Sequence, residues 1–274
     1  MSYTINLVGA GHVGRVLGRL LAQQGHAIGG VLTRSAASAQ AAVDFIGAGT
    51  ALVQYDRLAP ADIHIVAVGD DQIAAASTAL AQAVPLAGSV VCHCSGALAS
   101  SQLQAARAAG AAVASVHPIR SFADPALVAA QFAGTYCGVE GDAAALAVLA
   151  PALAAIGAQP VPIDAAAKTV YHAAAVFASN YLVTVLDAAL RAYVAAGVPE
   201  EVARRLAQPL ASEALANVFR LGAPAALSGP VARGDLATVA RQQAAVTAWD
   251  GATGQLYADL VAPTATLAAR KHNV

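Results

Sequence analysis

The stretch YTINLVGAGHVG, residues 3–14, places a short run of β-forming residues directly before a glycine-rich turn. Apolar residues at helical spacing then run from Val16 to Leu21 and predict a helix that ends near Gly25. A Gly-x-Gly-x-x-Gly turn alone is a weak signal. A strand before it and a helix after it are the context in which such a turn binds a dinucleotide. The stretch therefore predicts a dinucleotide-binding strand–turn–helix unit.

Each glycine of this turn has a physical role. Gly9 permits the tight turn, Gly11 lets the backbone approach a pyrophosphate, and Gly14 lets the helix lie close to the strand. The helix N-terminus offers N–H groups and partial positive charge to the phosphates. The predicted cofactor-binding residues of the turn are Gly9, Ala10, Gly11, His12, Val13 and Gly14. The alternative is a purely structural glycine turn.

The residues that end the next predicted strand, 27–33, favour one dinucleotide. An NAD enzyme usually has Asp or Glu here to bind the ribose 2′-hydroxyl. This chain has Thr33, Arg34 and Ser35 instead. A guanidinium and a hydroxyl suit a 2′-phosphate, and no adjacent carboxylate repels it. Arg34 and Ser35 therefore predict NADP(H), the alternative being an exposed arginine at a strand end.

Further apolar strands are expected at residues 62–68, 89–94 and 111–116, separated by alanine-rich helices. This alternation predicts an α/β fold with a Rossmann-type, doubly wound, mostly parallel sheet that is covered on both faces. Ligands of such sheets bind at the carboxyl ends of the strands. The residues expected at these ends are Val68, Gly69, Asp70, Ser95, Gly96 and His117.

The pattern becomes wholly helical near residue 164. Two more strands are expected at 136–139 and 159–163, and no run of strand type follows Lys168. We therefore expect an NADP-binding domain at residues 1–164 and an all-helical substrate and dimerisation domain at residues 165–274.

Lys168 is the residue of the helical half that most suggests chemistry. The chain has thirteen arginines and only two lysines. A partly buried lysine, unlike an arginine, can lose its proton and act as a general acid or base. His172 and Ser179 lie about 40° and 20° around an α-helix from Lys168, and Asn180 about 120° away. We predict Lys168 and His172 as catalytic residues, the alternative being a solvated helix face.

Other polar positions are candidates for substrate contact. His117 and Arg120 stand in a polar cluster after a strand, with a capping turn as the alternative, and Arg233 stands in a loop between helices. We predict His117 as a third catalytic residue. The expected substrate contacts are Ser95, Arg120, Ser179, Asn180 and Arg233. The run Cys92–Cys94 is interpreted as buried strand cysteines and not as a metal site, because alternate strand residues face opposite sides.

Composition limits the partners. Hydrophobic residues make up 58%, charged residues 11%, and the formal net charge is −1, which gives no reason to expect nucleic acid. The most apolar stretch, 173–186, carries polar interruptions and is shorter than the roughly 20 residues of a membrane span. Three cysteines and no signal peptide predict the cytoplasm. An alanine-rich core buries little area, which favours a homodimer.

Several motifs together resemble a bacterial family of Rossmann-like proteins with a C-terminal domain of unknown function. They are Val8–Gly14, His117–Pro118, Tyr171–Ala175, Ser179–Asn180 and Gly229–Asp235, and the resemblance covers essentially the whole chain. More distantly, the chain is similar to ketopantoate reductase, pyrroline-5-carboxylate reductase and the β-hydroxyacid dehydrogenases. These relatives imply NADP-dependent reduction of a carbonyl or imine, and a helical dimerisation domain like that of 6-phosphogluconate dehydrogenase.

One departure from these relatives concerns the lysine. In the ketopantoate and β-hydroxyacid groups a helical lysine is followed four residues later by asparagine, and here His172 stands at that spacing after Lys168. The leading hypothesis is an NADP(H)-dependent oxidoreductase of a small polar substrate. The alternatives are a non-catalytic NADP(H)-binding sensor and a deazaflavin-linked reductase of the same architecture.

Overall fold

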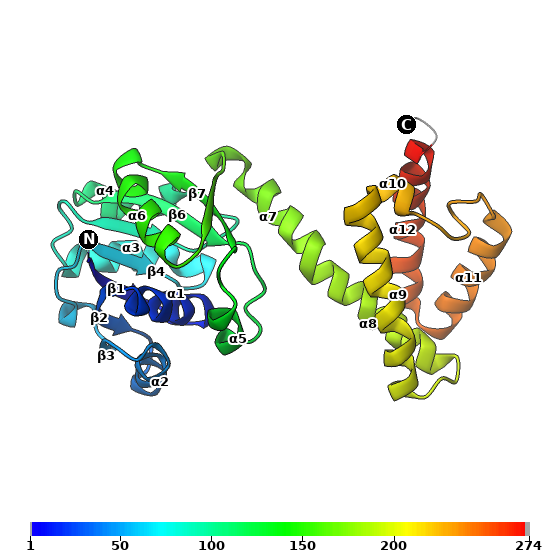
Figure 1. The fold of residues 1–274 in the computed structure, drawn as a ribbon, viewed down its shortest axis with the longest axis horizontal. Helices are drawn as coiled ribbons and strands as arrows, with labels where there is room; N and C mark the ends of the chain where they lie inside the picture. Colours follow the sequence, from blue (N-terminus) through cyan, green and yellow to red (C-terminus); the bar gives the residue numbers. More distant parts are fainter. Residues whose placement is uncertain (1, 272–274) are drawn as a thin grey trace. The chain divides into compact units, whose positions relative to one another are not determined.

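The computed structural model describes residues 2–271. The chain divides into two compact units, the N-terminal unit Met1–Phe177 and the C-terminal unit Ala178–Val274 (Figure 1). The first helix of the expected helical half, α7 (Lys168–Val176), belongs to the N-terminal unit by this division. The change from mixed to wholly helical structure occurs earlier, after residue 162.

The N-terminal unit is built on one sheet with the strand order β3-β2-β1-β4-β5-β6-β7-β8. Its strands are β1 (Thr4–Val8), β2 (Ala27–Leu32), β3 (Thr50–Leu52), β4 (Ile63–Val66), β5 (Val90–His93), β6 (Ala112–Pro118), β7 (Tyr136–Gly141) and β8 (Gln159–Pro162). All neighbours pair in parallel except β6 and β7, which are antiparallel. The predicted doubly wound, mostly parallel sheet is confirmed.

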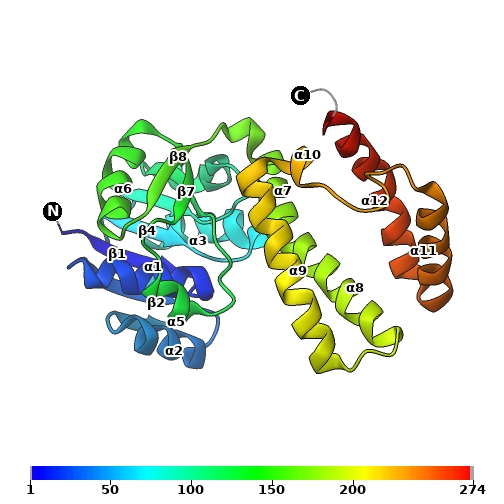
Figure 2. The same cartoon turned by 45° about the vertical axis from the view of Figure 1, so that its right-hand side comes forward.

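Both faces of this sheet are buried, as its apolar strands require. Ile5 and Leu7 of β1 point into one hydrophobic cluster and Val8 into the other, because successive strand residues face opposite sides. One cluster holds residues of α1 (His12–Gln23), α2 (Ala36–Ile46), α5 (Pro125–Ala130) and α6 (Ala143–Ala155). The other holds residues of α3 (Ile73–Ala83) and α4 (Gln104–Ala108) (Figure 2).

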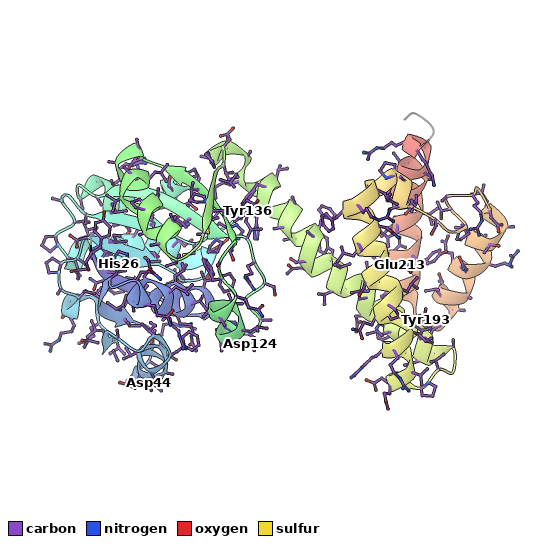
Figure 3. All side chains as sticks on the ribbon, viewed as in Figure 1. His26, Asp44, Asp124, Tyr136, Tyr193 and Glu213 are labelled. Atoms are coloured by element: carbon purple, nitrogen blue, oxygen red, sulfur yellow. The ribbon has the colours of Figure 1, made fainter. Side chains whose placement is uncertain are left out.

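Short polar side chains begin several of these helices. Asp124 accepts hydrogen bonds from the backbone N–H groups of Ala126 and Leu127 and caps α5, beside which Figure 3 labels it. Ser35 caps α2 in the same way, since its hydroxyl accepts a hydrogen bond from Ser38 N. Such caps fix where each strand–helix connection turns.

The described residues of the C-terminal unit form helices joined by turns and loops. Its helices are α8 (Leu182–Ala195), α9 (Glu200–Leu221), α10 (Ala223–Ala226), α11 (Leu236–Trp249) and α12 (Gly251–Arg270). Two pairs of consecutive helices pack against each other, α8 with α9 and α11 with α12 (Figure 1). Asp235 and Asp250 cap α11 and α12 by accepting hydrogen bonds from backbone N–H groups three residues later.

A π-helix interrupts the stretch in which we expected one polar stripe. α7 ends at Val176 and residues Phe177–Tyr181 are π-helical. The angular positions calculated for Ser179 and Asn180 assume α-helical geometry throughout, so they do not hold beyond Val176. The expected stripe therefore keeps only Lys168 and His172.

The most apolar helical segment is longer than the sequence indicated. It runs over Ala165–Ala195, 31 residues whose most apolar 18-residue window has a mean hydropathy of 1.5, and is long and apolar enough to cross a membrane. Of its most apolar window only 6% is buried. The expectation that this stretch is too short for a span is wrong, because helix continues through its polar residues.

Candidate functional site

The glycine-rich turn between β1 and α1 has the geometry expected of a phosphate-binding loop. Gly9 has φ +83° and a Cβ there would lie 2.6 Å from Ala67 O, so no other residue fits without strain. A Cβ on Gly14 would lie 2.7 Å from Gly9 O, which shows how closely the helix approaches the turn. Gly11 has open space beside it, where a ligand can reach its backbone.

A cavity of about 740 Å³ opens beside this turn. It is of the size that holds small molecules and cofactors. Six of the predicted cofactor-binding residues line it: Gly9, Ala10, Gly11, Arg34, Val68 and Gly69. The other seven do not line it, namely His12, Val13, Gly14, Ser35, Asp70, Ser95 and Gly96, and their contact with the cofactor stays a prediction. Arg15, Ser38 and Tyr55 also line it and were not singled out from the sequence. Asp71 is the one carboxylate among its described lining residues.

Ser35 contributes to this cavity indirectly. Its hydroxyl is engaged as the cap of α2 and lies 3.0 Å from the hydroxyl of Ser38, which does line the cavity. Ser38 therefore contributes a hydroxyl to the cavity in place of Ser35, and Thr33 contributes another. A capping serine followed by a second serine at the third helical position is the sequence signal that indicates this exchange.

The end of β5 is bound to the end of β4. Ser95 donates a hydrogen bond to Asp70 Oδ2 at 2.9 Å and accepts hydrogen bonds from Ala97 N and Leu98 N. Ser95 is buried, so its hydroxyl shapes the turn after β5. Its neighbour Gly96 carries no side chain, and the space beside it is occupied by the imidazole rings of His117 and His172.

Lys168 is enclosed by protein. Its side chain is 2% exposed, and Nζ donates hydrogen bonds to Ser95 O at 3.0 Å and Ser115 Oγ at 2.5 Å. Glu140 Oε1 lies 4.0 Å from Nζ, and this carboxylate accepts hydrogen bonds from the backbone and hydroxyl of Ser100. Burial lowers the pKa of Lys168, and the negative charge of Glu140 opposes that shift. The ammonium ties together β5, β6 and β7.

His117, Tyr171 and His172 form an aromatic cluster above these strand ends. His117 Nδ1 and the Tyr171 hydroxyl are hydrogen-bonded at 2.9 Å. The rings of Tyr171 and His172 meet the His117 ring edge to face, with centroids 5.6 and 5.4 Å away. All three side chains are half-buried. His172 Nδ1 is buried and makes no hydrogen bond among the described residues.

Two glycines make room for this cluster. A Cβ on Gly96 would overlap His172 Nδ1 and lie 2.8 Å from the His117 ring. A Cβ on Gly138 would overlap the hydroxyl oxygen of Tyr171. Gly138 is the register partner of His117 across the β6–β7 pair, so the phenol occupies the place of the missing side chain.

Burial keeps both His117 and Tyr171 of this cluster uncharged at neutral pH. Burial is the main cause that lowers the pKa of His117 to about 4, and the proximity of His172 and Lys168 contributes to that lowering. Burial also raises the pKa of Tyr171. His117 is therefore a neutral imidazole and Tyr171 a protonated phenol near pH 7, so the phenol carries a proton that it can donate.

The remaining predicted residues make other contacts. Arg120 donates hydrogen bonds to Gln131 O and Thr135 Oγ1, and His12 Nδ1 lies 2.6 Å from Phe122 O, so both fasten the segment after β6. Ser179, Asn180 and Arg233 belong to the C-terminal unit. Ser179 donates a hydrogen bond to Asn180 Oδ1. Their expected contact with substrate stays a prediction.

Sequence comparison finds two domains in this chain. Residues 2–118 match the Rossmann-like domain family, and residues 135–264 match a domain of unknown function, DUF2520. The resemblance drawn from the motifs is thereby confirmed. None of the curated protein sequences matches the chain.

Solved structures share the whole architecture. Protein TM1727 from Thermotoga maritima is 28% identical with a TM-score of 0.72, over 98% of this chain and 99% of that one. BF3122 from Bacteroides fragilis, a proposed NADP oxidoreductase, is 20% identical with a TM-score of 0.80, over 97% and 98%. An imine reductase from Myxococcus stipitatus in complex with NADP⁺ is 18% identical with a TM-score of 0.65, over 93% and 92%.

Proposed function

We propose that this protein is an NADP(H)-dependent oxidoreductase that acts on a carbonyl or imine carbon of a small polar substrate. The observation that carries the proposal is the cavity in which the Gly9–Gly14 turn and Arg34 meet. The turn leaves Gly11 open to a pyrophosphate, and Arg34 with Ser38 suits a 2′-phosphate. The architecture shared with an NADP oxidoreductase and an imine reductase supports the same proposal.

When bound, the nicotinamide supplies or accepts a hydride. The chain's part is to hold the substrate, and to give or take a proton. His117 and His172 stand at the carboxyl ends of the strands, where ligands of parallel sheets bind. We assign Lys168 a structural role in this site instead of a catalytic one. Since its Nζ is enclosed by Ser95, Ser115 and Glu140, it holds the strand ends in position beneath the reacting groups.

The cofactor assignment is tested by Arg34→Ala. Loss of a charge-assisted contact to the 2′-phosphate should weaken NADPH binding roughly 10- to 100-fold, while NADH, which lacks that phosphate, binds as before. Dissociation constants for both dinucleotides are measured by nicotinamide fluorescence. Arg57→Ala, an exposed arginine outside the cavity, is the matched control. Equal weakening of both dinucleotides by Arg34→Ala would contradict the assignment.

The activity is tested by following NADPH oxidation with a panel of 2-oxo acids and cyclic imines, and NADP⁺ reduction with β-hydroxyacids. Turnover of at least one class is expected. NADPH binding without turnover of any of them would favour the second candidate, a non-catalytic NADP(H) sensor. One observation supports that candidate, because the rings of His117 and His172 pack on each other and fill the space beside Gly96.

Two finer statements complete the proposal. We expect a homodimer formed through the C-terminal unit, whose helices expose large apolar side chains such as Leu210 and Phe219. The cytoplasm is the expected compartment, because the three cysteines are free thiols.

A further inference from the structure

The hydroxyl of Tyr171 is placed by two strands at once. It lies over Gly138 of β7, where a Cβ would overlap it, and 2.9 Å from Nδ1 of His117 in β6. Because His117 and Gly138 are register partners, the position of the phenol is set by one rung of the β6–β7 ladder. A side chain held this way loses little further freedom when it acts.

The ring of His117 is held from its other side. His172 meets it edge to face at 5.4 Å, and the absence of a side chain on Gly96 allows both imidazoles to pack there. Nδ1 of His117 is thereby fixed toward Tyr171. An imidazole whose ring is fixed by its neighbours can orient a hydroxyl group through the hydrogen bond between them.

Lys168 does not compete for the proton-transfer role. Its Nζ is surrounded by Ser95 O, Ser115 Oγ and Glu140, and its side chain is 2% exposed. Tyr171 is half-buried, so its side chain is less enclosed than that of Lys168. The phenol is therefore a better candidate for proton donor than the ammonium.

We infer that Tyr171 is the proton donor of the proposed reduction and that His117, donating from Nδ1–H to the phenol oxygen, orients it. This inference rests on the proposed function. Reduction adds a hydride at the carbonyl or imine carbon and needs one proton at oxygen or nitrogen. The Tyr171 O–H bond breaks as the new O–H or N–H bond forms, and water returns a proton to the tyrosinate through His117.

The titratable groups that face the pair come from several elements. His172, Lys168 and Asp70 face His117, and Cys137 faces Tyr171. Burial lowers the pKa of His117 to about 4 and raises the pKa of Tyr171, so at neutral pH the phenol holds its proton and the imidazole is neutral.

The first test is Tyr171→Phe, which removes the hydroxyl and keeps the ring. With the panel substrate that the wild-type protein reduces, kcat should fall roughly 100- to 10,000-fold, the range for loss of general-acid catalysis. The NADPH dissociation constant should stay within twofold of wild type. Tyr136→Phe is the matched control, since Tyr136 starts the same strand β7 and is 55% exposed (Figure 3).

The second test needs no substrate. Nitrogen NMR of the cofactor-free protein should show His117 with its proton on Nδ1, and Tyr171→Phe should shift it toward the Nε2–H form that free imidazole side chains prefer. A Tyr171→Phe protein with wild-type kcat, or a His117 tautomer unchanged by the substitution, would overturn the inference and leave the proposed function intact. A wild-type protein that binds NADPH and turns over no substrate would overturn both.

Discussion

At the scale of single residues, the structure places Lys168 in surroundings that differ from those the sequence suggested. A lone lysine in an arginine-biased chain indicated a titrating group. The structure places it in a buried pair with Glu140, which is 8% exposed and satisfied by Ser100. A buried ion pair is costly to break because the remaining partner keeps its charge in a medium of low polarity.

This arrangement predicts the stability of three variants. Lys168→Met and Glu140→Gln should each lower the free energy of unfolding by about 3–5 kcal/mol, because each leaves one buried charge without its partner. The double variant should lose clearly less than the sum of the two, since no charge is then left unpaired. Urea unfolding followed by far-ultraviolet circular dichroism measures all three. Strictly additive losses would show that the two side chains do not interact.

The role of a single residue could be predicted where neighbouring residues in the sequence determine it. The roles of Gly9, Gly11 and Gly14 follow from their own spacing, so the sequence alone indicated them. Tyr171 lies in one of the motifs, but the sequence does not indicate its role, because its position depends on the gap at Gly138, in a strand distant along the chain. Glu140 was missed for the same reason. No spacing in the sequence relates it to Lys168.

At the scale of elements, β1 and β4 share a buried polar contact. Asn6 donates hydrogen bonds from Nδ2 to Ala59 O and accepts one from Gly30 N, and its Nδ2 lies 3.5 Å from His64 Nδ1. His64 is fully buried, and its Nε2 makes no hydrogen bond among the described residues. Burial lowers the pKa of His64 to about 4.

A pH dependence of stability follows from this lowered pKa. Above about pH 6.5 His64 is neutral in both the folded and unfolded states, so it has no effect there. As the pH falls below 6.5 the unfolded chain binds the proton first, and the free energy of unfolding should drop by about 2 kcal/mol between pH 7 and pH 5. His117 acts in the same direction, because its pKa is also lowered to about 4.

His64→Gln isolates this contribution. Urea unfolding of the wild type and the variant is compared at pH 5, 7 and 8.5. The variant should lose less stability than the wild type between pH 7 and pH 5, by about the 2 kcal/mol assigned to His64. The two proteins should respond alike between pH 7 and pH 8.5. Parallel losses below pH 7 would mean that His64 does not carry the effect.

Elements were predictable where one periodicity extends over the whole segment. The strands at the sheet centre read as continuous apolar runs because both of their faces are buried. The π-helix at Phe177–Tyr181 could not be predicted, because its residues fit an α-helix equally well by composition. It changes the direction in which every later side chain points, so the expected place of Ser179 was lost with it.

At the scale of the whole molecule, the two units differ in how well each buries its apolar side chains. The N-terminal unit holds two clusters of fully buried residues, one on each face of its sheet. The described C-terminal unit buries few side chains, and α9 alone exposes Leu206, Leu210, Leu215 and Phe219 at 47%, 62%, 48% and 83%. On α9, Leu206 and Leu210 lie about one turn apart on one face, and Leu215 and Phe219 about one turn apart on the opposite face. Exposed apolar side chains of this number are typical of an interface with protein or membrane.

We expect this surface to be covered by a second copy of the chain. Sedimentation or light scattering of the protein purified without detergent should give the mass of two chains. The double variant Leu210→Glu with Phe219→Glu should give one chain, because two carboxylates per copy cannot be buried without partners. Leu236→Glu, at a leucine of α11 that is 70% exposed, should leave the dimer intact and so assign the interface to α9.

NADPH binding should persist in all variants, since the cavity lies within the N-terminal unit. A monomeric wild type would contradict the dimer, and recovery of the protein only with membranes would assign the apolar segment Ala165–Ala195 to a lipid bilayer instead.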